Sequence, residues 1–105
     1  MTTPDPATPV LLEAIVKRQA VVVTYNRQEV TLAPHILYTR HGDLHVDAVT
    51  LERDGKPPKE LKVGTYKLAG LSGVRMTPRR FMVSALFDPA TERYAGETLM
   101  AVERG

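Results

Sequence analysis

The chain of 105 residues contains no cysteine. Disulfides, thiolate metal sites and cysteine nucleophiles are therefore all excluded. The chain also lacks an apolar stretch long enough to cross a bilayer. Residues 1–9 have neither the basic start nor the apolar core of a signal peptide. Together these absences predict a soluble, cytoplasmic protein.

Motifs that carry catalysis are missing as well. Ser72 stands in Gly70-Leu71-Ser72-Gly73, which differs from a nucleophile elbow because the second glycine would have to occupy position 74. No pair of carboxylates sits in an apolar setting suited to acid–base work. Glycine-rich phosphate loops of either common type are also absent. We therefore predict a non-enzymatic protein with no cofactor.

The best metal-ligand candidate is the string His41, Asp43, His45 and Asp47. On a strand, Asp43, His45 and Asp47 would project from one face. Successive side chains on that face are roughly 7 Å apart, which is wide for ligands of one ion. We favour a polar outer face opposite an apolar inner one, and predict no metal site.

The chain has the length of one domain. Residues 1–7, rich in threonine and proline, are expected to form a disordered tail, and residues 8–105 a single domain. Thr8-Pro9 indicates a helix start, with threonine as the cap and proline at the first helical position. The residues that would share one face of this helix are Leu11, Ala14, Ile15 and Arg18.

The rest of the chain has the pattern of short strands. The β-branched run at 20–25 predicts a strand buried on both faces. Pro34 predicts an edge, a bend or a bulge in the next strand. The further expected features are strands at 30–39, 44–49, 61–68 and 74–77, a hairpin turn at 40–43, an unassigned segment at 79–87, and a strand or helix at 97–103. One helix and about five short strands indicate a small closed or partly open barrel.

Positive charge is concentrated in the middle of the chain. Residues 53–80 carry eight basic residues against two acidic ones, whereas both flanking parts are net acidic. Such asymmetry is typical of an anion-binding face, but also of a solvated lysine-rich face, and both interpretations stay open. In the first, the cations that would contact phosphates are Lys62, Lys67 and Arg75, with Tyr66 as a stacking surface.

The order and spacing of apolar residues over residues 11–87 resemble the WYL domain. The matching positions are Leu12, Ala14-Ile15, Val23-Thr24-Tyr25, Leu32-Ala33-Pro34, Ile36-Leu37, Gly42-Asp43-Leu44-His45-Val46, Ala48, Tyr66-Lys67-Leu68, Leu71 and Val74. By this resemblance the family's Trp-Tyr-Leu signature falls on residues 44–46. Three of its signature or basic positions are replaced, by Val30, His45 and Gly70, whereas Lys67 keeps a positive charge.

The resemblance implies a mainly β fold, a small Sm-like or SH3-like β-barrel with one N-terminal α-helix. It also implies a ligand-sensing or nucleic-acid-binding module of bacterial transcription regulators. Our first hypothesis is a module that binds an anionic ligand, single-stranded nucleic acid or a nucleotide. The ligand-binding residues would be His45, Lys62, Tyr66, Lys67 and Arg75. The alternative is a protein-interaction or oligomerisation module with a degenerate ligand site, whose partner is a second copy or a regulator protein.

Overall fold

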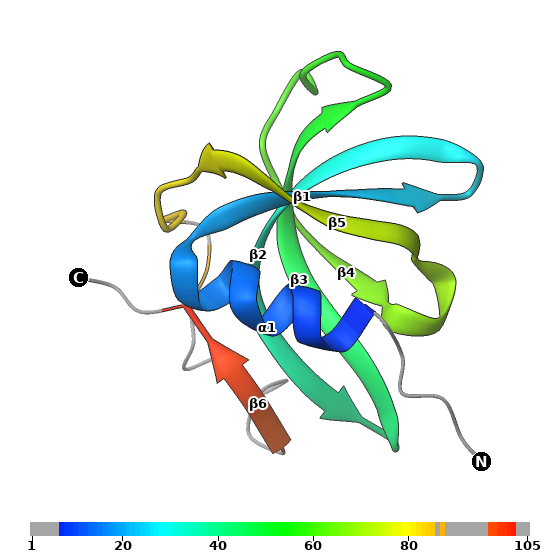
Figure 1. Ribbon diagram of the computed structural model, residues 1–105, viewed down its shortest axis with the longest axis vertical. Helices are drawn as coiled ribbons and strands as arrows, with labels where there is room; N and C mark the ends of the chain where they lie inside the picture. The colour runs from blue at the N-terminus through cyan, green and yellow to red at the C-terminus, as the bar shows by residue number, and fades with distance from the viewer. Residues whose placement is uncertain (1–6, 86, 88–96, 103–105) are drawn as a thin grey trace.

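The computed structural model describes residues 7–85, 87 and 97–102, which form one helix followed by an antiparallel β-sheet (Figure 1). The helix is α1 (Ala7–Lys17). The strands are β1 (Gln19–Tyr25), β2 (Gln28–Arg40), β3 (Asp43–Arg53), β4 (Val63–Lys67), β5 (Ser72–Arg80) and β6 (Glu97–Ala101). A single 3-10 turn, η1 (Leu68–Gly70), joins β4 to β5. The expectation of a mainly β chain with an N-terminal helix is confirmed.

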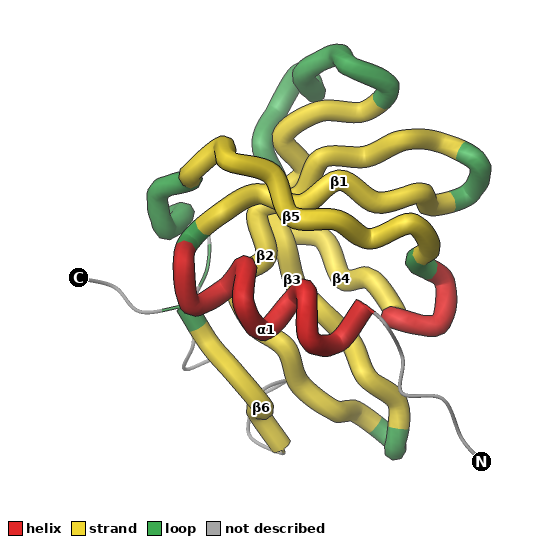
Figure 2. The backbone as a smooth tube through the Cα atoms, in the orientation of Figure 1, coloured by secondary structure: helices red, strands yellow, loops and turns green. Residues whose placement is uncertain are grey.

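The helix α1 begins at Ala7, one residue before the expected cap at Thr8. Ala7 is buried and belongs to the folded domain, and residues 1–6 of the expected tail lie outside the described residues. The predicted inner face is confirmed at Leu11, Ala14 and Ile15, all of which are buried. Figure 2 shows α1 lying across the strands, where it packs against β5, β2 and β1. No helix in the described part of the chain has the length and hydropathy needed to cross a membrane.

The strands pair in the order β4-β3-β2-β1-β5, and β6 pairs with β2 off this path. Within the described residues no pairing joins β4 to β5, so the sheet is open and not closed into a barrel. Closure depends on strand tilt and on the stagger between strands distant in the sequence. Local sequence patterns do not specify either quantity, which is why the sequence left a closed and a partly open barrel both possible, and the barrel implied by the WYL resemblance is not what the structure shows.

The long strand β2 is paired along both edges. On one edge β3 follows it throughout, and on the other β1 pairs with its first half and β6 with its second half. Pro34 lies between the segments paired with β1 and β6, and the register with β3 shifts between Pro34 and Ile36. The predicted bulge is thereby confirmed. Because proline has no N–H, this gap leaves no donor unpaired at position 34.

The core is built from α1 and the inner face of the sheet, and it extends further over β3 than expected. Asp47 and Val49 belong to the predicted outer face of residues 44–49, yet their exposed fractions are 0% and 3%. Asp47 is covered by Tyr38 of β2, whose hydroxyl donates a hydrogen bond of 2.7 Å to the carboxylate. The interpretation of Asp47 as a solvated polar residue is therefore wrong.

Candidate anion-binding site

Two of the predicted ligand-binding residues, His45 and Lys67, lie together. They face each other as a pair across β3 and β4. The Lys67 ammonium lies 3.3 Å from the Asp43 carboxylate, and His45 Nδ1 lies 3.0 Å from the Asp43 carbonyl oxygen. A shallow hollow of about 200 Å³ adjoins Lys67. The positive charge of this His45–Lys67 cluster is offset by Asp43.

Tyr66 does not offer the stacking surface that the sequence suggested. Its ring is only 8% exposed, and its edge contacts Tyr25 with ring centroids 5.1 Å apart. The Tyr66 hydroxyl shares a 2.7 Å hydrogen bond with Thr50 Oγ1. Tyr66 is therefore a core residue that fixes β4 against β3.

Lys62 and Arg75 lie apart from the His45–Lys67 cluster. Lys62 precedes β4 and is 4.0 Å from Glu60, whereas Arg75 on β5 is 3.3 Å from Glu29. Among the described residues, no hydrogen bond or ion pair joins either cation to His45 or Lys67. The five predicted residues thus do not form one site.

The basic middle segment is neutralised to a large extent by its neighbours. Four of its eight cations lie within 4.0 Å of a carboxylate, and three of those carboxylates come from outside the segment. These pairs are half-exposed, so each contributes little to stability. Their effect is to divide the sequence's positive excess into separate, partly compensated places. Residues 53–80 therefore do not form a continuous cationic face.

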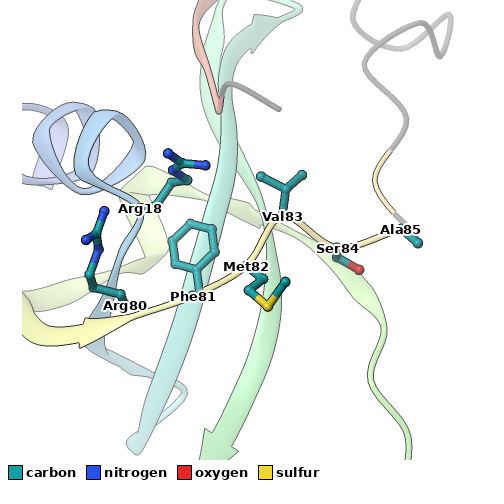
Figure 3. Close-up of a pocket in the computed structure, with 7 residues that line it drawn as sticks. All are labelled: Arg18, Arg80, Phe81, Met82, Val83, Ser84 and Ala85. Atoms are coloured by element: carbon teal, nitrogen blue, oxygen red, sulfur yellow. The ribbon is translucent and has the colours of Figure 1, made fainter. Parts of the chain in front are cut away.

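A larger hollow of about 670 Å³ lies beside the end of α1, and we call it the arginine hollow (Figure 3). Its lining residues are Arg18, Arg80, Phe81, Met82, Val83, Ser84 and Ala85. Both guanidinium groups lie on the side of the Phe81 ring nearest α1, and residues 82–85 run away from it. None of these residues was among the predicted ligand-binding residues.

The end of α1 places Arg18 in the arginine hollow. The Arg18 N–H still donates to Ile15 of the helix, and the residue then turns the chain with a φ of 54°. This left-handed conformation favours glycine and costs a residue such as arginine about 1–2 kcal/mol. The Arg18 carbonyl accepts a hydrogen bond of 3.0 Å from the Phe81 N–H, next to the Gln19–Arg80 pair of β1 and β5. Strand pairing therefore holds the two arginines side by side.

His35 of β2 supports the wall of the arginine hollow from behind. The Ser84 N–H donates to His35 Nε2 at 2.9 Å, and His35 Nδ1 lies 2.7 Å from the Ala33 carbonyl oxygen. The imidazole also packs between Phe81 and Phe87, with ring centroids 5.1 and 5.3 Å away. The segment at 79–87 that the sequence left unassigned begins as the end of β5, and its described residues 81–85 and 87 form no strand but are fixed to β2 through His35.

The two arginines of the hollow differ from the other cations in their surroundings. Within the described part of the chain, neither Arg18 nor Arg80 has a carboxylate within ion-pair distance. Met82 beside them is 90% exposed, an unusual position for a large apolar side chain. Guanidinium groups bind phosphate and carboxylate with paired hydrogen bonds. The hollow therefore combines two uncompensated cations with an apolar wall, at a volume within the range of ligand sites.

The signal for the arginine hollow in the sequence was indirect. Arg79-Arg80 precedes an apolar run, and Arg18 follows a helix, but 62 positions separate the two arginines that converge. Only the pairing of β1 with β5 brings them together. As for the metal candidate, the described residues contain no group of three or more potential ligands close enough to hold an ion.

Comparison with protein families, with curated proteins and with solved structures found no match for this chain. The WYL resemblance therefore rests on the residue pattern alone.

Proposed function

We propose that this chain is a non-enzymatic regulatory module of WYL type that binds an anionic ligand in the cytoplasm. The ligand class is single-stranded nucleic acid or a nucleotide, in a context of transcription regulation. The observation that carries the proposal is the arginine hollow, where Arg18 and Arg80 both line the wall and, among the residues that the structure describes, no carboxylate pairs with either. The His45–Lys67 cluster is a weaker candidate because Lys67 already forms an ion pair with Asp43.

Nucleotides match both halves of the arginine hollow. A phosphate accepts paired hydrogen bonds from guanidinium groups, and its charge relieves the repulsion between the two arginines. Phe81 and Met82 offer an aromatic and an apolar surface beside them, and base–aromatic stacking contributes about 1–3 kcal/mol per base. Recognition by phosphate contact and stacking tolerates any base, which fits a binder of single strands.

The test is fluorescence anisotropy with a short single-stranded oligonucleotide at two salt concentrations. We expect Arg80→Gln to weaken binding about tenfold and to lower the slope of log affinity against log salt by about one. The matched control is Arg79→Gln, which removes the same charge one residue earlier, at a side chain paired with Glu52. Because both variants change the net charge equally, general electrostatic attraction is the same in each.

Three outcomes decide between the sites. No binding by the unchanged chain at low salt would refute the proposed function. Equal effects of Arg80→Gln and Arg79→Gln would remove the arginine hollow as the site. A selective loss with Lys67→Gln would assign the ligand to the His45–Lys67 cluster.

A second candidate function, docking onto a protein partner or a second copy, is favoured by the sheet edges. Among the described strands, β4 pairs only with β3 and β5 only with β1, so each has one edge without a strand partner. Leu61, just before β4, is a large apolar side chain that is 52% exposed. Open strand edges are templates for pairing with another chain. Light scattering over a range of concentrations tests this function, and a strictly monomeric mass would contradict self-association.

A further inference from the structure

His35 is fully buried, and its hydrogen bonds define its protonation state. Nε2 accepts a hydrogen bond from the Ser84 N–H, so this nitrogen carries a lone pair and no hydrogen. Nδ1 faces the Ala33 carbonyl oxygen at 2.7 Å, so the proton of the neutral ring sits there. The geometry therefore requires a neutral imidazole with one assigned tautomer.

We propose that His35 is a positioning residue for the arginine hollow, and that its protonation releases the wall formed by residues 81–85 and expels the anionic ligand. This inference rests on the proposed function. A proton from solvent that binds Nε2 would set a ring N–H against the Ser84 N–H at 2.9 Å. The attraction at that position becomes a repulsion. Ser84 and the residues beside it must then move away from β2.

Packing transmits the change to the ligand side of the wall. Phe81 and Ser84 line the arginine hollow and also contact the His35 ring. Phe87 packs on the same ring and donates its N–H to the Ser84 carbonyl oxygen at 3.1 Å. A shift of Ser84 therefore alters the hollow at two lining residues.

The positive charges nearest to His35 on the side of the arginine hollow oppose protonation of its ring. The hollow itself contributes Arg18 and Arg80. The hydrogen bonds and ion pairs described for the other charged residues of the elements that pack against β2 run to groups other than His35. On α1, Glu13 and Lys17 pair with each other. On β3, Asp43 pairs with Lys67, Glu52 pairs with Arg79, Asp47 accepts a hydrogen bond from Tyr38, and Arg53 donates one to Gln28. On β6 the charged residue is Glu97, whose side chain is not described. His45 on β3 stacks on Tyr38, and β1 carries no charged residue.

The sign of the pH dependence distinguishes this device from ordinary anion binding. A histidine that contacts the anion directly gains charge in acid and strengthens binding. The His35 device does the opposite, because only the neutral ring holds the wall in place. Below the midpoint of the ring's titration, each further pH unit should weaken the apparent affinity about tenfold.

The experiment measures oligothymidylate affinity by anisotropy from about pH 8 to about pH 5 at constant ionic strength, because salt changes phosphate binding strongly. Internal phosphodiesters and thymine keep their charge over this range, so the probe carries hydroxyl ends and a dye that does not titrate. We expect the affinity of the unchanged chain to fall towards pH 5, approaching a tenfold loss per pH unit once most of the His35 ring is protonated, with His35→Gln constant within about twofold. The glutamine carbonyl can accept the Ser84 N–H at any pH. The matched control, His45→Gln, should keep the acid loss.

Equal or tighter binding in acid by the unchanged chain would overturn the inference, as would an identical acid loss in His35→Gln. Absence of binding at neutral pH would instead refute the proposed function. A ligand-free measurement separates the two and does not depend on any variant folding. In nitrogen–proton NMR spectra, the Ser84 amide signal should shift in step with the His35 ring nitrogens. If the Ser84 amide signal did not move while the His35 ring nitrogens titrated, no such coupling would exist.

Discussion

The hydrogen bond between Tyr38 and Asp47 offers a quantitative test of how the buried carboxylate is tolerated. We expect Tyr38→Phe to lower the free energy of unfolding by about 2 kcal/mol, because a hydrogen bond to a charged acceptor contributes about 1.5–3 kcal/mol. Asp47 has no exposed surface, so water cannot replace the lost hydroxyl without a structural change. The phenylalanine ring keeps the apolar contacts of Tyr38, so the substitution removes one oxygen atom only.

Two other tyrosines provide a graded control series. The Tyr66 hydroxyl bonds to Thr50, a neutral partner, so Tyr66→Phe should cost about 1 kcal/mol. The Tyr25 hydroxyl has no hydrogen bond within the described residues, so Tyr25→Phe should change the free energy of unfolding by less than about 0.5 kcal/mol. The structure thus predicts the ranking Tyr38, Tyr66, Tyr25.

The assay is urea unfolding followed by far-ultraviolet circular dichroism, with the free energy extrapolated to water. An unchanged slope against urea across the three variants shows that they share one unfolding transition. A cost for Tyr38→Phe within about 0.5 kcal/mol of that for Tyr25→Phe would refute the reasoning. In that case the hydrogen bond from Tyr38 to the Asp47 carboxylate would contribute nothing measurable to the free energy of unfolding.

Three further substitutions test other parts of the structure. Arg18→Gly should leave the free energy of unfolding unchanged or raise it, by relief of the left-handed backbone, while anion affinity in the anisotropy assay falls about tenfold. Gly42→Ala should lower the free energy of unfolding by about 1 kcal/mol, and with it the melting temperature, because Gly42 has a φ of 80°. Gly70→Ala should leave both unchanged, because Gly70 has an ordinary φ and open space for the added methyl group. Phe87→Ala should cost about 3–5 kcal/mol in urea unfolding because Phe87 is buried against His35. A near-normal stability would show that residue 87 lies outside the cooperative core.

The parts of the fold that depend on local chemistry could be predicted from the sequence. The apolar spacing gave the inner face of α1, and the hairpin turn at 40–43 was found from its turn residues. His41 and Gly42 there both adopt the positive φ that such a turn needs. The effect of Pro34 was also foreseen, because a residue without an N–H disturbs any ladder. Each of these signals acts within a few residues of the chain.

The candidate site could not be predicted because it depends on pairing between distant segments. The basic stretch was taken for one face, yet β4 and β5 lie at opposite ends of the strand order, so Lys67 and Arg75 are separated. Tyr66 was expected at the surface, but β3 pairing directs its ring into the core. Arg18 and Arg80 meet only because β1 pairs with β5. A pattern read along the chain carries no information on which strands become neighbours.

The division of one edge of β2 between β1 and β6 also sets an order of assembly. The β1–β2–β3–β4 meander is joined by two two-residue turns and one loop at 54–62, so its ladders can form early at a small cost in chain entropy. The second half of that edge must wait for β6 and for Val102 directly after it, whose N–H donates to the His35 carbonyl oxygen from more than sixty residues away. During synthesis the meander therefore emerges with part of β2 uncovered, next to the apolar Ile36 and Leu37. The strand that covers this part of β2, β6, is therefore made after the whole meander.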